Sequence, residues 1–362
     1  MTATATAAAR PAAPATSLEG RRARPIIFWA VVGAGFVVLA IYIFTSWIAS
    51  DDFQRIETGA DELGSVTKLW VQLFQVLSLV AAAAIVVICV RQCVRERRIT
   101  FDTMLVIAWI SVYWQDPIIN YIRTGFFYNS EFINFGSWTE HIPGWMSPNG
   151  ALLPEPLAFV GALYVWLGPA ASLLTYWVMR RAKARWPRLG NIGLVVTAWL
   201  VMVALDLLCE LIWVRTEMYA YSGTVHGLSI WGGEKYQFPI YESVLWPMMW
   251  TAMGALKYFR DDKGHTVVER GVERVRAVRW RTPLRVLAII GFANVAMLTY
   301  NVAFQGFVLH NDKTPSGYPT YLRNGMCGEG TDYACNGPEI PIPLPRSSAV
   351  PPGGTEPVQP SR

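Results

Sequence analysis

Long apolar runs alternate along the chain with short, charged connections. Seven of these runs approach the length of about 20 residues that a helix needs to cross a bilayer. The pattern therefore predicts an all-α integral membrane protein, a seven-transmembrane helical bundle. The expected spans lie near residues 26–48, 69–90, 101–122, 157–179, 192–214, 238–259 and 284–309.

Basic residues fall on alternate connections between these spans. Most of the 31 Lys and Arg residues lie in the N-terminal tail and in segments 91–100, 180–190 and 257–285. Cytoplasmic loops carry an excess of Lys and Arg, so the N-terminus is expected inside and the C-terminus outside. Seven spans satisfy this alternation without an exception. The prediction is a multi-pass protein of the cell membrane.

The two ends of the chain differ in composition from the membrane domain, which we place at 26–310. Residues 1–25 are rich in Ala, Thr and Pro and are expected to form a disordered cytoplasmic tail. Segment 311–335 is expected to be an ordered outer segment, and the Pro-, Gly- and Ser-rich residues 336–362 a second disordered tail. The first span lacks a good cleavage site of small residues and is expected to be a signal anchor.

Composition agrees with a membrane protein. Hydrophobic residues make up 53% of the chain and charged residues 16%, whereas soluble domains carry about 25% charged residues. Sixteen Trp and fifteen Tyr residues fit aromatic belts at the two membrane interfaces. The formal net charge of +5 is too modest to indicate a nucleic acid. The expected partner is the lipid bilayer, and the oligomeric state stays open.

Four carboxyl groups lie at membrane depth. Asp206 and Glu210 are four residues apart within the apolar run 192–214 and so share one helix face. Asp116 and Glu242 lie near the outer ends of their own spans, at a depth similar to that of Glu210. Carboxylates at such depth are costly and usually mark a working site. We expect all four to be catalytic and to line one outer pocket, with Asp206 deepest.

Further polar and aromatic side chains lie at similar depth and are candidates for binding a substrate. The alternative is structural, because polar side chains also hold membrane helices together. The candidates are Tyr113, Asn120, Gln72, Gln75, Trp213, Tyr241, Asn301 and Gln305.

Neighbouring carboxyls suit acid catalysis. A protonated carboxyl is a general acid, and an ionised neighbour stabilises a cation. This pairing favours cyclisation or dehydration through an oxocarbenium or carbocation. Neither a Rossmann glycine pattern, a P-loop, an HExxH motif nor a His-rich cluster occurs, so no cofactor and no metal is expected.

Two outer loops, 123–156 and 215–237, are long enough to cap the bundle, and they carry His141 and His226. Either histidine is an acid–base partner or a surface residue without a role. Cys327 and Cys335 lie in the outer segment with seven residues between them. An outside location permits a disulfide between these two, and the alternative is a pair of free thiols.

Three motifs carry a family resemblance: QDPIINY at the end of the third span, EKYQFPIYES before the sixth, and CGEGTDYAC in the outer segment. With the seven spans, they resemble the AveC-type spirocyclase family over most of residues 25–336. The resemblance implies an actinobacterial type of membrane enzyme of secondary metabolism. The implied reaction is spiroketal closure or dehydration on a polyketide-like or lipid-like, amphipathic substrate. It supplies no catalytic residues.

Two other classes of membrane protein compete with an enzyme. Intramembrane acids also suit a proton-coupled small-molecule transporter. Against a transporter stand the odd number of spans and the absence of internal repeats and of paired broken helices. A retinal photoreceptor is excluded because residues 286–309 contain no Lys for a Schiff base.

Overall fold

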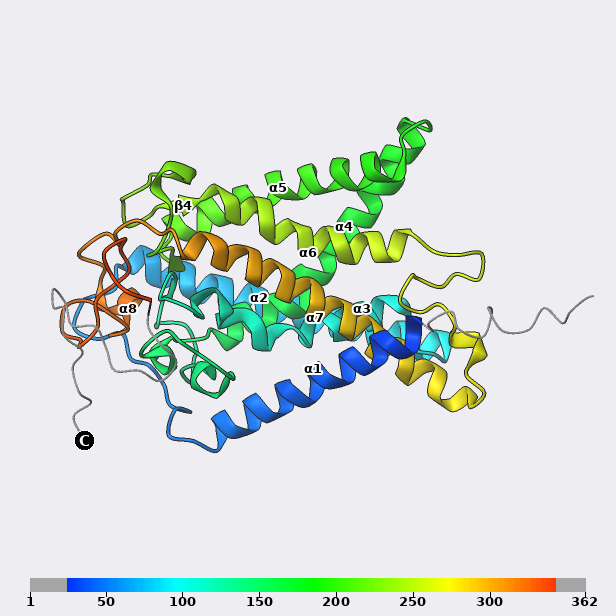
Figure 1. Cartoon of the computed structure of the whole chain (residues 1–362), viewed down its shortest axis with the longest axis horizontal. Helices are drawn as coiled ribbons and strands as arrows, with labels where there is room; N and C mark the ends of the chain where they lie inside the picture. Colours follow the sequence, from blue (N-terminus) through cyan, green and yellow to red (C-terminus); the bar gives the residue numbers. More distant parts are fainter. Residues whose placement is uncertain (1–24, 343–362) are drawn as a thin grey trace, which may run out of the picture.

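The computed structural model describes residues 25–342, which form a bundle of helices running between two ends (Figure 1). The predicted tails at residues 1–24 and 343–362 lie outside the described residues. Within the described part the α-helices are α1 (Pro25–Ile48), α2 (Ser65–Glu96), α3 (Phe101–Ile110), α4 (Ala162–Arg185), α5 (Asn191–Arg215), α6 (Ile240–Tyr258), α7 (Arg281–Val308) and the short α8 (Thr320–Arg323).

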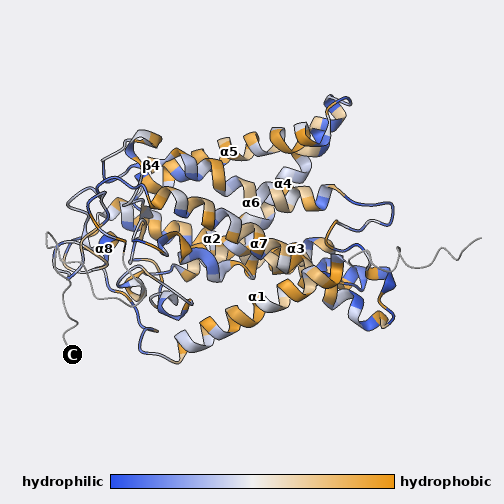
Figure 2. Ribbon diagram, viewed as in Figure 1, coloured by the Kyte–Doolittle hydropathy of each residue, from blue (hydrophilic) through white to orange (hydrophobic). Residues whose placement is uncertain are grey.

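Five helical segments in the described part are long and apolar enough to cross a membrane. They are α1, α2, α4 with the π-helical turn Leu157–Gly161 before it, α5, and α7 with the turn before it. Figure 2 shows hydrophobic residues along these helices and hydrophilic residues gathered toward the two ends of the bundle. The chain is therefore a multi-pass membrane protein by the length and composition of its helices.

The third and sixth predicted spans, 101–122 and 238–259, are not among these segments. The described part of the chain therefore has five candidate membrane spans and not the seven that were predicted. Helix α3 ends after ten residues and the chain continues as the 3-10 helix Tyr113–Asn120. Helix α6 has 19 residues and includes Glu242 and Pro247. Both segments pack against α4 and α7, and α6 also packs against α5. Because neighbouring helices cover them, they need fewer apolar side chains than helices that face lipid.

Helices α1 and α7 cross at two glycines. A Cβ on Gly33 would overlap the backbone carbonyl oxygen of Leu287, and one on Gly291 would overlap that of Trp29. Small residues allow this close approach of two backbones inside a membrane. Helix α1 therefore packs closely against α7, which carries the buried polar residues Asn294, Asn301 and Gln305.

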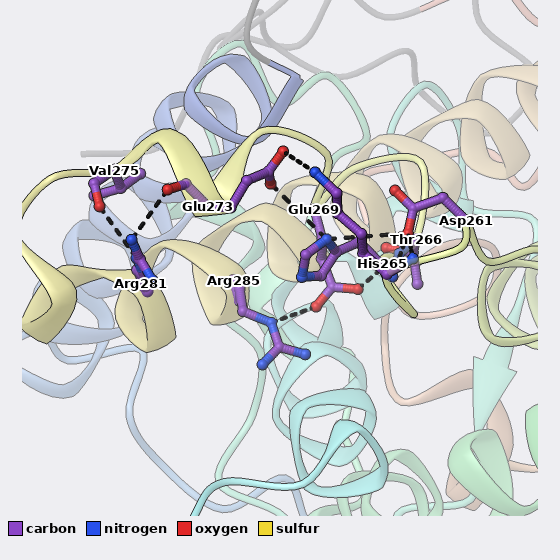
Figure 3. A network of polar contacts seen from close by, with 9 residues as sticks. Asp261, His265, Thr266, Glu269, Glu273, Val275, Arg281 and Arg285 are labelled. Atoms are coloured by element: carbon purple, nitrogen blue, oxygen red, sulfur yellow. Dashed lines mark hydrogen bonds and ion pairs between the residues drawn. The ribbon is translucent and has the colours of Figure 1, made fainter.

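One end of the bundle carries the basic connections, and we call it the basic end. The start of α1 and the connections α2–α3, α4–α5 and α6–α7 all lie there (Figure 1). Figure 3 shows the polar network that fixes the last of these connections. The fully buried Glu269 accepts a hydrogen bond from Arg285 Nε at 2.6 Å and another from the backbone N–H of Thr266 at 3.0 Å.

The opposite end, the loop end, holds loop 123–156, segment 216–239 and the C-terminal segment (Figure 1). Two antiparallel strand pairs lie here: β1 (Phe127–Tyr128) with β2 (Tyr219–Ala220), and β3 (Ser229–Ile230) with β4 (Phe238–Pro239).

The C-terminal segment is tied to this end. Cys327 and Cys335 are joined in a disulfide. Arg123 donates hydrogen bonds to the backbone oxygens of Ile340 at 2.7 Å and Gly337 at 3.5 Å. Residues just beyond 335, which composition placed in an unpacked tail, therefore contact the outer loops.

Candidate active site

A cavity of about 110 Å³ lies between α4, α5, α6, α7, the 3-10 helix and the β1–β2 pair. Its walls combine carboxyl groups, phenols and indoles, with no Lys, Arg or His among the lining residues. The carboxyls are Asp116, Glu210 and Glu242; the aromatic lining residues with polar tips are Tyr128, Tyr164, Tyr219, Tyr221, Tyr300, Trp109, Trp213, Trp246 and Trp250.

Asp116 receives two phenolic hydrogen bonds. Its Oδ2 accepts from the hydroxyl of Tyr128 at 2.6 Å, and its Oδ1 accepts from the hydroxyl of Tyr164 at 2.8 Å. Tyr164 comes from α4 and Tyr128 from strand β1. Short hydrogen bonds to both oxygens stabilise the ionised form of a carboxyl.

Glu210 faces two phenols, Tyr219 and Tyr221, and Glu242 faces one, Tyr300. Glu210 Oε2 accepts from the hydroxyl of Tyr221 at 3.0 Å. The hydroxyl of Tyr300 on α7 lies 2.8 Å and 3.0 Å from the two carboxylate oxygens of Glu242. Glu242 therefore has fewer phenolic partners than Asp116 and Glu210 have.

Asp206 lies one turn before Glu210 on α5 and is 2% exposed, but it does not line the cavity. Its Oδ2 has no hydrogen-bond partner in the described part of the chain. The structure thus places this carboxyl outside the cavity lining, one helical turn from Glu210.

The predicted amides on α7 do not reach the cavity. Gln305 Nε2 donates to the backbone oxygen of Ile118 at 2.7 Å, and Asn301 Nδ2 lies 3.5 Å from that of Gln115. Pro117 and the 3-10 geometry leave carbonyls in this segment without regular helical partners. The two amides satisfy them and hold Asp116 in place.

Two more of the predicted binding residues also make backbone contacts. Asn120 Oδ1 accepts from the N–H groups of Gly125 and Phe126 at 2.8 Å and 2.9 Å. Gln75 Oε1 accepts from the N–H of Ile133 at 2.8 Å. Both side chains fix the outer loop 123–156 onto the bundle.

The four remaining predicted binding residues lie in different surroundings: two pack against aromatic rings, one is exposed and one lines the cavity. Tyr113 packs against Trp138 with ring centroids 5.0 Å apart, and Tyr241 stacks on Phe307 at 4.0 Å. Gln72 is exposed on α2. Of the eight predicted binding residues, Trp213 is the one that lines the cavity.

The cap histidines lie away from the cavity. His141 Nε2 is 3.1 Å from Asp52 Oδ2 and 3.2 Å from Ser50 Oγ. The backbone N–H of His226 donates to Asp312 Oδ2 at 2.7 Å. Neither histidine is among the residues that line the carboxyl cavity.

Comparison with protein families identifies the chain. The family model described as Spirocyclase AveC-like matches residues 96–324, which is more than half of the sequence. The chain belongs to the AveC-like spirocyclase family. The match contains every residue that lines the cavity, and membership makes the protein an enzyme of the cyclase type. Searches of curated proteins and of solved structures found no match.

The tyrosines of this AveC-like cyclase are what the sequence pattern missed. Tyr128 and Tyr219 sit opposite each other in the β1–β2 pair, and Tyr221 follows two residues later. Strands of two residues leave almost no periodic signal. Alternation in Tyr219-Ala220-Tyr221 is the one available hint, since side chains two apart on a strand share a face.

Burial keeps these loop tyrosines protonated. Desolvation first, and the neighbouring negative carboxyl second, raise the pKa of Tyr128 and Tyr219 well above the ordinary value of 10.0. Tyr221 is shifted in the same direction for the same reasons. At neutral pH all three phenols are therefore hydrogen-bond donors to the carboxyls.

Proposed function

We propose that this protein is a cofactor-free cyclase that closes a spiroketal, or a related cyclic ether, by acid-catalysed loss of water. The supporting observation is one aromatic cavity that joins three carboxyls to five phenols and includes no basic side chain among its lining residues. Family membership supports the cyclase class. An amphipathic, polyketide-like substrate is the class that fits an apolar cavity inside a membrane protein.

The proposed first step is protonation of a hemiketal hydroxyl by Glu210. The carbon–oxygen bond then breaks, water leaves and an oxocarbenium ion remains. Asp116, whose two phenolic hydrogen bonds favour its ionised form, lies in the same cavity and is proposed to stabilise this cation. The indole faces of Trp213 and Trp246 offer additional cation–π attraction.

Ring closure completes the cycle. A second hydroxyl of the substrate attacks the oxocarbenium carbon and forms the new carbon–oxygen bond. Its proton returns to the carboxylate of Glu210, so the enzyme is regenerated and the net change is the loss of one water. Glu242, hydrogen-bonded to Tyr300, is proposed to orient the attacking hydroxyl.

The size of the cavity restricts what part of the substrate it holds. Pockets for drug-sized ligands occupy about 300–1,000 Å³, whereas this cavity measures about 110 Å³. We propose that it encloses the reacting ring system while the rest of the substrate extends beyond it.

For the membrane orientation we propose the N-terminus inside and the C-terminus outside. The support is that the basic connections share one end of the bundle, while the disulfide and the longer loops share the other (Figure 1). In this orientation α3 with the 3-10 helix, and α6, pass between the same two sides within the shelter of the five apolar helices.

A deletion strain tests the function. Loss of the gene should remove one metabolite and accumulate a precursor that is heavier by one molecule of water. Expression of the full-length chain should restore the product. If the deletion strain instead makes the finished product and only its distribution between cells and medium changes, the protein is a transporter and the cyclase proposal is wrong.

A further inference from the structure

We propose that Asp116 and Glu155 form a carboxyl pair that shares one proton, with Glu155 as the positioning residue that keeps Asp116 ionised. The catalytic consequence rests on the function proposed above. The shared proton does not, and it is measurable without any substrate. Glu155 belongs to loop 123–156, and no role for it was predicted from the sequence pattern.

Glu155 is enclosed at the entry to α4. It precedes Pro156 and the π-helical turn Leu157–Gly161, and its backbone N–H bonds the oxygens of Leu153 and Gly136 at 3.0 Å and 3.3 Å. Its side chain is 0% exposed. No donor group in the described part of the chain reaches either of its carboxyl oxygens.

The neighbours of Glu155 include no cation. The titratable groups that face it in the described chain are Asp116 and the phenols of Tyr113, Tyr128 and Tyr164. A buried carboxylate without a cation or a donor is very costly. Glu155 is therefore neutral in the folded protein.

The two carboxyl groups lie within hydrogen-bonding reach of each other. Ionised carboxylates are acceptors only, so a hydrogen bond between them requires a proton on one of them. Asp116 already accepts from Tyr128 and Tyr164, whereas Glu155 accepts from no donor. The proton therefore resides on Glu155, which donates to Asp116.

The charges agree with this assignment. Burial first, and the negative charge of Asp116 second, raise the pKa of Glu155 well above its ordinary value. Glu155 does not line the cavity, so it acts through Asp116. A third donor lowers the basicity of the aspartate, which keeps it available as an anion beside a developing cation.

Infrared spectroscopy of the purified full-length protein in detergent tests the pair. Protonated carboxyls absorb separately from carboxylates, so a difference spectrum between wild type and Glu155→Gln should show the loss of one protonated carboxyl at neutral pH. Glu131→Gln is the control, because the Glu131 carboxyl is paired with the ammonium group of Lys68 at 3.7 Å; it should leave this region unchanged. A Glu155→Gln spectrum identical to wild type overturns the proposal.

A second variant decides the question even if Glu155→Gln does not fold. Asp116→Asn removes the negative neighbour, so the Glu155 band should titrate at lower pH than in wild type. An unchanged titration means that the two carboxyls are not coupled, and the proposal fails. The infrared result does not depend on the result of the deletion strain. If Glu155→Gln loses the protonated-carboxyl band but the deletion strain has unaltered metabolites, the cyclase function is disproved and the proposal of a shared proton is still supported.

Discussion

The carboxyls of the cavity are held by phenols and not by cations. A Lys or Arg partner would fix a carboxyl as an anion across the physiological range. Phenols that remain protonated donate a hydrogen bond without supplying charge, so each carboxyl is free to carry or release a proton. This choice of partner suits acid catalysis better than it suits structural stability.

At Glu155 the absence of donors predicts a pH dependence of stability. Its pKa is raised in the folded state, so its contribution to folding is complete below the ordinary value of 4.5 and is lost as pH rises through the folded-state pKa. Between pH 4.5 and the folded-state pKa of Glu155, this group should make thermal stability in detergent fall with rising pH. In Glu155→Gln this decline should be smaller.

Melting temperatures of both proteins across this pH range measure the effect. Glu131→Gln, which removes an ion-paired glutamate in the same loop, serves as the control and should keep the wild-type slope. Parallel slopes for wild type and Glu155→Gln would contradict the neutral, buried state of Glu155.

Sequence alone located some of these residues and missed others for identifiable reasons. The sequence predicted that one pocket holds Asp116, Glu210 and Glu242. Helical spacing indicates which face of a helix each residue lies on, and the direction of each span indicates its depth in the membrane. Glu155 could not be predicted, since it lies in a non-periodic loop beside two prolines. The backbone contacts of Asn301 and Gln305 could not be predicted, because an amide on a buried face gives the same sequence pattern whether it meets a ligand or a carbonyl.

At the scale of elements, the break after α3 explains why span 101–122 was predicted as one helix and how Asp116 is presented to the cavity. The apolar run 101–122 is long enough for a spanning helix. In the structure α3 ends at Ile110, and the 3-10 helix Tyr113–Asn120 that follows carries Asp116. The side-chain amides of Gln305 and Asn301 on α7 donate to backbone carbonyls of this 3-10 segment. Pairing between segments so distant in sequence cannot be read from the local pattern of either one.

The glycine crossing of α1 and α7 gives a prediction with a matched control. Gly33→Ala and Gly291→Ala place a methyl group against the backbone of the other helix and should destabilise the protein by about 1–3 kcal/mol. Gly35→Ala on the same α1 helix meets no atom within 4 Å and should leave stability unchanged or slightly higher. Thermal melting of the three variants in detergent is the measurement; equal effects would show that the crossing is not tightly packed.

For the whole molecule, orientation in the membrane is the property that follows from the distribution of charge. A reporter fused after residue 335 should be active only if it functions outside the cytoplasm. One inserted in the exposed turn at Lys263 and Gly264, at the basic end, should be active only if it functions inside. Two reporters active on the same side would contradict the proposed orientation.

Five apolar helices around two more polar inner segments place a polar site inside a membrane protein. The five apolar helices supply the apolar surface. The two inner segments are covered by neighbouring helices, so they can carry Asp116 and Glu242 without exposing these carboxyls to lipid. The cap loops contribute Tyr128, Tyr219 and Tyr221, so the site is complete only when bundle and loops are folded together. This dependence accounts for a site that no single segment of the sequence reveals.

The most direct test of acid catalysis is turnover by Asp116→Asn and Glu210→Gln in the complemented deletion strain. Each change nearly keeps the shape of the side chain and retains one acceptor oxygen, but removes the titrating carboxyl. Each should lower the ratio of cyclised product to open precursor at least 100-fold, on the scale of general acid–base catalysis. Glu131→Gln, away from the cavity, should match wild type at equal membrane abundance. If both cavity variants are present in the membrane at normal levels and still form product at the wild-type rate, the carboxyls are structural and the mechanism proposed for this protein is wrong.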